Sequence, residues 1–249
     1  MWISQPNAGF RVNKAVRATA TAALDLLAPE RCIYCDQLSR TRSAVCGYCA
    51  RALPLNNDAC PQCALPGCGA ALCPDCLQRP PALTSIRAAF TYDPALALFM
   101  HQWKYLADRR LSLTAAKLLL SSLILSSKNG ILMPTPLHWR RLLKRGFNQS
   151  DDLLHALCSN RPDLRAACTK SLRLVRREAT AQQVGASRAE RAKNLRGVFA
   201  ARGDFRDRVV TLIDDVCTTG ATGNAMASTL LDAGAREVHL ICLARTPAH

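Results

Sequence analysis

The stretch VVTLIDDVCTTGAT, residues Val209–Thr222, decides how the rest of this chain is interpreted. Its first five residues are an apolar, mostly β-branched run of the kind that forms a buried parallel strand. Two carboxylates, Asp214 and Asp215, follow where we expect that strand to end, and Thr218–Thr222 form a small turn rich in hydroxyl groups. Apolar residues then recur at helical spacing up to Gly234, which is typical of a helix C-terminus. The stretch therefore predicts a strand, an acidic pair, a turn and a helix, in that order.

That order of elements suits a phosphorylated sugar. Backbone N–H groups at a helix N-terminus bind phosphate, and Gly220 lets a ligand approach the backbone closely. Adjacent carboxylates accept hydrogen bonds from sugar hydroxyls and bind hydrated Mg²⁺. A P-loop is excluded because no Lys ends the turn, and the chain has no G-x-G-x-x-G fingerprint. We therefore predict a ribose 5-phosphate site formed by Asp214, Asp215, Thr218, Thr219, Gly220, Ala221 and Thr222.

The segment Leu212–Thr222 resembles the phosphoribosyl-pyrophosphate (PRPP) loop of type I phosphoribosyltransferases. In that family, the two acidic residues take the ribose hydroxyls and the Thr/Gly turn wraps the 5-phosphate. The resemblance implies an α/β fold, with a parallel sheet covered by helices on both faces, and PRPP bound together with Mg²⁺. An ordinary strand-turn-helix unit with a solvated acidic turn is the alternative interpretation.

The chain is strongly basic. Its 249 residues, enough for one sizeable α/β core and a smaller unit, include 33 Lys and Arg against 18 Asp and Glu. Much of the excess lies between Leu137 and Arg208, where 17 basic residues stand against 7 acidic ones. A net charge of +15 favours polyanionic partners such as nucleic acid or nucleotides, and a basic surface that only aids solubility is the simpler alternative. Aromatic residues, at 5%, are too few for a surface of many stacked rings.

Four Cys-x-x-Cys pairs lie in residues 32–76, separated by 10, 10 and 9 residues. Each pair places two thiolates on one side of a tight loop, and two pairs complete a tetrahedral Cys₄ zinc site. A segment with so few large apolar residues needs metal binding in order to fold, so we predict two structural zinc ions. The eight predicted ligands are Cys32, Cys35, Cys46, Cys49, Cys60, Cys63, Cys73 and Cys76.

The spacing alone does not decide which pairs share an ion. Sequential pairing places the cysteines of residues 32–49 on one zinc and those of residues 60–76 on the other. A cross-braced arrangement instead combines the first pair with the third and the second with the fourth. We favour the sequential arrangement, a double zinc ribbon, with Cys68 left over as an alternative ligand or a small turn residue. Thiols kept for metal binding, with no secretory signal before them, favour a cytoplasmic protein without a membrane span.

We expect three regions along the chain. Residues 1–30 form a short amphipathic lead-in helix, residues 31–80 the double zinc ribbon, and residues 81–249 the phosphoribosyltransferase-like domain. Helices are predicted to start at Pro94, at Arg109 and after the N-cap Ser150. Apolar runs predict strands at 88–92, 131–136, 172–175, 209–213 and 238–244.

Two further segments carry candidate ligand-binding residues. An Arg-rich loop before the Ser150 helix lies where α/β folds bind ligands, and its guanidinium groups suit a pyrophosphate or a nucleic-acid backbone. Residues 176–196 are polar and basic with no apolar stripe, which predicts a mobile flap that closes over a phosphorylated ligand. A merely solvated basic loop is the alternative for the first segment. The loop candidates are Arg140, Arg141, Lys144, Arg145, Asn148 and Gln149, and the flap candidates are Arg176, Thr180, Gln183, Arg191 and Asn194.

Taken together, these motifs resemble the ComF family (ComFC and GntX-type proteins) over almost the whole chain. The resemblance rests on the cysteine pairs, Pro134–Leu137, the run RGFNQ at Arg145–Gln149, the flap residues and the loop Asp214–Thr222. Members of that family join an N-terminal zinc ribbon to a type I phosphoribosyltransferase domain. The resemblance implies a role in DNA uptake during natural transformation (competence). It also implies binding of single-stranded DNA or nucleotides, and a helicase-like competence protein as a partner.

The residues leave three functions open. In the first, the protein binds and processes incoming DNA, and its pocket holds PRPP, a phosphorylated nucleotide or a strand end. In the second, it is an active Mg²⁺-dependent phosphoribosyltransferase of nucleotide salvage, with Arg145 stabilising the departing pyrophosphate. In the third, the zinc ribbon docks a protein partner and the PRPP loop is a vestigial or regulatory nucleotide sensor. No segment resembles the base-recognising hood of salvage enzymes, so the sequence names no acceptor and leaves turnover undecided.

Overall fold

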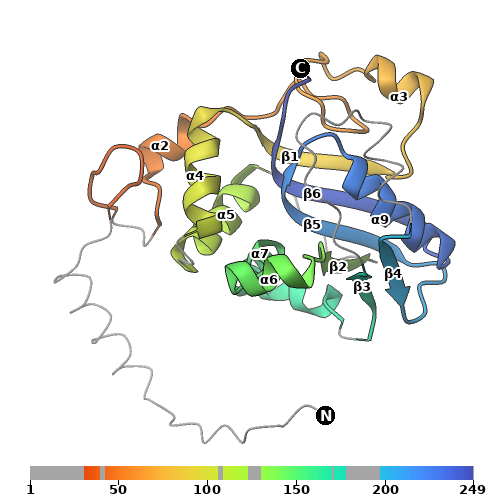
Figure 1. Ribbon diagram of the computed structural model, residues 1–249. Helices are drawn as coiled ribbons and strands as arrows, with labels where there is room; N and C mark the ends of the chain where they lie inside the picture. Colours follow the sequence, from red (N-terminus) through yellow and green to blue (C-terminus); the bar gives the residue numbers. More distant parts are fainter. Residues whose placement is uncertain are drawn as a thin grey trace, which may run out of the picture.

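A computed structural model describes residues 31–39, 43–105, 109–122, 130–169, 171–177 and 197–248 (Figure 1). The lead-in helix that we predict within residues 1–30 lies outside these ranges. None of the helices in the described ranges combines the length and apolarity needed to cross a bilayer.

The centre of the molecule is a four-stranded parallel sheet (Figure 1). Its strands lie in the order β1 (Ser85–Thr91), β6 (Glu237–Arg245), β5 (Val209–Cys217) and β2 (Gly130–Pro134). The two central strands are near-continuous apolar runs because both of their faces are buried. The α/β fold with a parallel sheet that the sequence predicts is confirmed.

Helices cover both faces of this sheet. On one face, α4 (Pro94–Tyr105), α5 (Arg109–Ser122) and α7 (Gln149–Asn160) share a core with side chains from all four strands. On the other face, α9 (Ala221–Asp232) packs over a second core. Successive side chains of β5 point to opposite faces of the sheet, so this strand contributes to both cores. Ile213 belongs to the first core and its neighbour Leu212 to the second.

The strand that we predict at 172–175 forms, but outside the central sheet. It is β3 (Arg173–Arg176), and it pairs antiparallel with β4 (Phe199–Arg202), a strand that the sequence analysis missed. This small sheet packs on the α9 side through Leu174 and Phe199, both of which are buried in the second core. A short 3-10 helix, η1 (Pro162–Ala167), links α7 to the hairpin.

The Arg-rich segment after β2 is helical, which corrects the loop expected there. Residues Trp139–Arg145 form α6, and Gly146, with a φ of +77°, ends it in the left-handed region. The following helix, α7, begins two residues earlier than predicted, because its N-cap is Asn148 and not Ser150. The Asn148 side chain accepts a hydrogen bond from the backbone N–H of Ser150 at 3.3 Å.

The cysteine-rich segment packs against the edge strand β1. Leu55 forms an antiparallel bridge with Phe90. Backbone hydrogen bonds from Asn56 to the carbonyl of Ala89 and from Thr91 to that of Pro54 flank the bridge. This pairing covers backbone groups that an exposed edge would leave open to other chains.

The two halves of the cysteine-rich segment lie on opposite faces of the sheet. The first half carries α2 (Gly47–Arg51) and is held to α4 by a hydrogen bond from the Tyr34 hydroxyl to the carbonyl of Ala95, at 3.0 Å. The second half carries α3 (Pro74–Gln78) and is tied to β1 by a bond from the N–H of Ile86 to the carbonyl of Gln62, at 2.7 Å. The cysteine-rich segment therefore packs on both faces of the sheet at the edge formed by β1.

Gly203 follows β4 with a φ of +105°, and a Cβ atom built there would lie 2.8 Å from the carbonyl oxygen of Ser171 and 2.6 Å from Leu172 Cδ2. We expect Gly203→Ala to lower the free energy of unfolding by about 2 kcal/mol or more, because strain and a backbone clash add. Gly197→Ala, at the other end of β4 with a φ of +74° and open space around it, is the matched control. Urea denaturation of both variants checks this, and equal losses would contradict the clash.

Candidate functional site

The candidate site is a pocket of about 240 Å³ at the carboxyl edge of the sheet. It forms because the pairing of β2 with β5 ends at Pro134 and Ile213, whereas β5 remains paired with β6 as far as Cys217. The Asp214–Asp215 pair therefore lies inside the last part of β5, and not beyond the strand end as we predict from sequence. Ligand sites of open α/β sheets lie at this edge.

Asp214 is held by three donors. Its Oδ1 accepts hydrogen bonds from the Thr135 hydroxyl at 2.7 Å, from the Ser150 hydroxyl at 3.0 Å and from the N–H of Asp215 at 3.0 Å. Burial raises the pKa of the Asp214 carboxyl to about 7, and the charge of Asp215 adds to the rise, while the hydrogen bonds oppose it. Asp214 can therefore gain or lose a proton near neutral pH.

Asp215 has a different environment from its neighbour. Its Oδ2 lies 3.3 Å from the Lys104 Nζ, at the end of α4, and its Oδ1 accepts from the N–H of Val216 at 2.7 Å. The pair therefore combines one carboxylate beside a lysine with one held by two hydroxyl groups.

The turn after β5 leads into the N-terminus of α9. Gly220 is the N-cap in the left-handed region, with a φ of +76°, and no side chain caps the helix. Thr218, Gly220 and Thr222 line the pocket. Thr219 has another role, since its hydroxyl accepts from the N–H of Ala221 at 3.3 Å and stabilises the turn. Helix N–H groups and exposed hydroxyls of this kind attract an anion.

Gln149 carries a buried donor in the pocket wall that has no partner among the described residues. The side chain is only 2% exposed, and its Oε1 accepts a hydrogen bond from Arg145 Nη1 at 3.2 Å. Within the described ranges, no acceptor lies within hydrogen-bond distance of its Nε2. A buried amide without a partner costs free energy, which a ligand acceptor would offset.

Most of the predicted ligand-binding residues whose side chains are described line this pocket. Arg145, Asn148, Gln149 and Arg176 line it, together with the acidic pair. Arg140 lies instead on α6, with its guanidinium carbon 5.3 Å from the ring of Trp139. The side chains of Arg141 and Lys144 are not described, and Thr180, Gln183, Arg191 and Asn194 lie outside the described residues.

Four residues of this region escaped the sequence analysis. Thr135 and Ser150 hold Asp214, and Lys104 pairs with Asp215. Trp139 is 54% exposed on α6, beside Arg140. A tryptophan beside a run of basic residues was a signal in the sequence that could have indicated Trp139 as a binding residue. No such signal marked Lys104, because its place in the pocket depends on tertiary packing.

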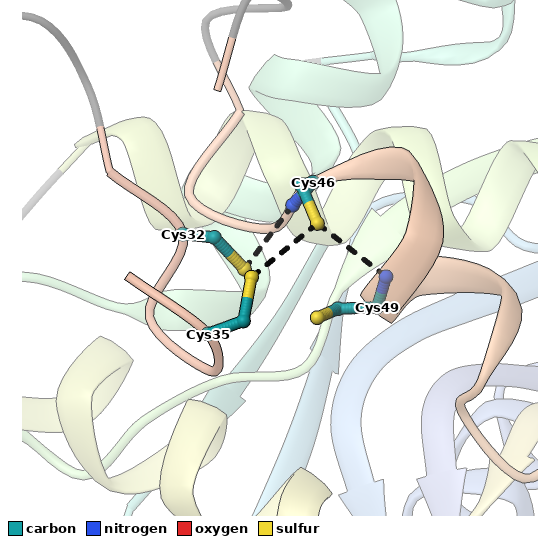
Figure 2. Close-up of side chains that lie close together, drawn as sticks. All are labelled: Cys32, Cys35, Cys46 and Cys49. Carbon is teal, nitrogen blue, oxygen red and sulfur yellow. Dashed lines mark hydrogen bonds between the residues drawn. The ribbon is translucent and has the colours of Figure 1, made fainter. Parts of the chain in front are cut away.

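The cysteines form two separate tetrads, as the sequential pairing predicts. The Sγ atoms of Cys32, Cys35, Cys46 and Cys49 lie within 4.8 Å of one another, and Figure 2 shows their side chains converging. The second tetrad, Cys60, Cys63, Cys73 and Cys76, has the same spread. Zn–S bonds of about 2.3 Å in a tetrahedral ion require sulfur atoms at such separations, so both tetrads fit structural zinc.

The backbone supports thiolates in both tetrads in the same way. The N–H of Cys46 donates to Cys32 Sγ at 3.4 Å, and that of Cys73 donates to Cys60 Sγ at 3.4 Å. Burial by itself raises the pKa of the Cys32 thiol, but backbone N–H groups outweigh it and lower the pKa to about 6. For Cys60 the same balance lowers the pKa to about 7. Burial raises the pKa of the Cys49 thiol in the first tetrad and of the Cys63 and Cys76 thiols in the second, so the backbone favours one thiolate in each tetrad. Zinc binds thiolates, so an ionised Cys32 and an ionised Cys60 suit the metal.

We expect purified protein to carry two zinc ions per chain and Cys35→Ser to carry one, because the first tetrad loses a ligand. Cys68→Ser is the control and should keep both, since Cys68 lies outside the tetrads. Inductively coupled plasma mass spectrometry measures the zinc content. Loss of an ion from the Cys68→Ser protein would contradict this ligand assignment.

Comparison with known proteins agrees with this geometry. Residues 23–77 match the double zinc ribbon domain. The chain is 34% identical over 229 residues to the DNA utilization protein YhgH of Salmonella typhimurium, covering 89% of this chain and 99% of the relative. It is 28% identical over 234 residues to competence protein F of Haemophilus influenzae, covering 86% and 96%.

A third relative is the competence protein ComFC of Streptococcus pneumoniae, which is 33% identical over 161 residues, covering 65% of this chain and 68% of the relative. The resemblance that the sequence motifs suggest is therefore confirmed, and the chain belongs to the ComF family of YhgH-like and competence proteins.

Proposed function

We propose that this protein handles DNA during uptake, and that its pocket binds PRPP or a 5-phosphorylated nucleotide together with Mg²⁺. The names of its relatives, DNA utilization protein and competence protein, support the biological setting. The chemistry of the pocket supports the ligand class. The net charge of +15 supports a polyanion as the larger partner.

The pocket offers separate places for the parts of such a ligand. The 5-phosphate would lie at the N-terminus of α9, where Thr218 and Thr222 add hydroxyl groups. The ribose hydroxyls and a hydrated Mg²⁺ would lie at Asp214 and Asp215. The basic side chain of Arg145 lines the same pocket and would face the pyrophosphate or the next phosphate of a strand.

The observation that carries this proposal is the buried amide of Gln149. A side chain that is 2% exposed, with its oxygen engaged and its Nε2 without an acceptor among the described residues, is unfavourable unless a ligand provides the acceptor. Phosphate and ribose oxygens are such acceptors. Arg145 and Arg176 line the same pocket, and their positive charges favour a negatively charged ligand over a neutral one.

Helix α6 supplies a surface for single-stranded DNA next to the pocket. The helix runs from Trp139 to Arg145, between the pocket-lining residues Leu137 and Arg145. Its sequence, WRRLLKR, holds four basic residues. Trp139 is exposed and lies beside Arg140, so an aromatic face and a cation are available together. Stacking on an aromatic ring and charge pairing with phosphates are the two contacts that single strands use.

Mg²⁺–PRPP should bind zinc-loaded protein in calorimetric titration, and Gln149→Met should weaken that binding by about tenfold, because one hydrogen bond to a charged ligand is lost. The same substitution should change the free energy of unfolding by no more than about 1 kcal/mol, because removal of a buried donor without a partner among the described residues opposes the loss of the hydrogen bond from Arg145. A purely structural Gln149 would instead show lower stability with unchanged affinity.

Asp214→Asn/Asp215→Asn should abolish PRPP binding in the same assay. The control is Asp151→Asn/Asp152→Asn, which removes the same charge from the first turn of α7, outside the pocket lining. Failure of the unaltered protein to bind PRPP would overturn the proposed ligand. Release of pyrophosphate in the presence of candidate acceptor bases would show turnover in addition to binding.

Trp139→Ala should lower the affinity for single-stranded DNA by about tenfold, which corresponds to the loss of one stacked base. Tyr48→Ala, at an aromatic side chain that is 77% exposed on α2, is the control and should bind normally. Fluorescence anisotropy with a labelled oligonucleotide at several salt concentrations measures both. Affinity should fall steeply with salt in every variant, and binding without salt dependence would contradict a phosphate-directed surface.

A further inference from the structure

Arg245 is a buried arginine at the end of the central strand β6, and its side chain lies between the second cysteine tetrad and the pocket loop. The residue is 6% exposed. Its backbone is paired with Cys217 of β5 and with Thr91 of β1. The sequence motifs assign it no role, and it does not line the pocket.

The guanidinium group of Arg245 joins two distant parts of the chain. Its Nε donates to the carbonyl of Cys63, a member of the second tetrad, at 3.1 Å. Its Nη1 donates to the carbonyl of Cys217 at 3.3 Å and to that of Thr246 at 3.0 Å. Cys217 is the last residue of β5, directly before the turn that contains Thr218 and Gly220. One side chain therefore touches a metal-binding loop and the start of the phosphate-binding turn.

A second hydrogen bond strengthens the pocket end of this link. The Thr246 hydroxyl accepts from Arg245 Nη1 at 3.4 Å and donates to the carbonyl of Thr218 at 3.1 Å. The N–H of Thr246 also donates to the carbonyl of Cys217. The backbone on both sides of the Cys217–Thr218 peptide is thus held by Arg245 and its neighbour.

The charge of Arg245 has no carboxylate partner among the residues that the structure describes. Within the described ranges, no Asp or Glu oxygen lies within ion-pair distance of its guanidinium group, and its acceptors there are carbonyl and hydroxyl oxygens. Burying such a cation without a counter-charge is costly. Two sources of negative charge would flank it in the fully loaded protein: a zinc ion with four thiolates, of formal charge about −2, and an anion bound at the turn.

We propose that Arg245 is a positioning residue that couples zinc binding at the second tetrad to phosphate binding at the 218–222 turn. This inference rests on the proposed PRPP site. Zinc bound at the second tetrad would fix the loop that contains Cys63, whose carbonyl accepts a hydrogen bond from Arg245. Arg245 in turn donates to the carbonyls of Cys217 and Thr246, which position the turn. Because coupling between two binding sites is reciprocal in binding free energy, PRPP strengthens zinc binding at the second tetrad, and loss of that zinc weakens PRPP binding. We expect the tighter binding to appear as slower release of zinc.

The first tetrad provides an internal control. It packs against α4 and α5, where the N–H of Ala44 donates to the hydroxyl of Thr114 and Tyr34 bonds to Ala95. Among the described residues, the side-chain hydrogen bonds of Arg245 reach the second tetrad and not the first. Zinc bound by Cys32, Cys35, Cys46 and Cys49 should therefore be released at the same rate with and without PRPP.

The test is the rate of zinc release from the full-length, zinc-loaded protein to a chromogenic chelator, with and without Mg²⁺–PRPP. Cys35→Ser protein, which keeps only the second ion, assigns the two kinetic phases. We expect PRPP to slow release from the second tetrad by about tenfold and to leave the first phase unchanged. Arg245→Lys, which keeps the charge but cannot reach both carbonyls, should remove the slowing while retaining both zinc ions.

Calorimetry on the same samples separates this inference from the proposed function. PRPP binding to the unaltered protein without any change in zinc release overturns the role of Arg245 and leaves the PRPP site standing. Equal slowing of both phases also overturns it, because that result indicates general stabilisation by ligand. Absence of PRPP binding overturns the proposed function and this coupling together. Should Arg245→Lys fail to fold, the release rates of the unaltered and Cys35→Ser proteins still test the coupling, and unchanged release from the second tetrad overturns it.

Discussion

The unequal length of two neighbouring strands is the constraint on which the site depends. Pairing between β2 and β5 ends at Pro134, while β5 continues beside β6 to Cys217. The uncovered end of β5 is where Asp214 and Asp215 meet the pocket. Thr135 and Ser150 fill part of the gap that β2 leaves, and they hold Asp214 with hydroxyl groups. The acidic pair is therefore both in a regular strand and accessible to a ligand.

The zinc tetrads contribute to this sheet as well as to their own loops. Residues 54–56 pair with the edge strand β1, and the two tetrads lie against opposite faces. A segment with few large apolar residues depends on metal for its order, so zinc loading and the edge of the sheet are physically connected. The contacts of Arg245 extend that connection to the turn after β5.

Motifs whose chemistry depends on spacing are recognisable from the residues alone. Four Cys-x-x-Cys pairs predict two tetrads, and the structure forms them with the sequential pairing. The run from Val209 to Thr222 predicts strand, turn and helix, and β5 and α9 follow it. Local signals near Arg140 and Ser150 are less reliable. Basic residues favour loops only weakly, and Asn148 competes with Ser150 for the N-cap, so the predictions for α6 and for the start of α7 were wrong.

By itself, the sequence determined the α/β class, the two cysteine tetrads, the family and the strand-turn-helix stretch that carries the acidic pair, because each depends on residue type at short range. Tertiary structure alone decided which distant groups share the pocket. Lys104 reaches Asp215 from the end of α4, and Thr135 reaches Asp214 from beyond β2. Arg245 spans two loops that are far apart in the chain. Such contacts arise from the order of strands in the sheet and the packing of helices over it, and no local pattern of residues encodes them.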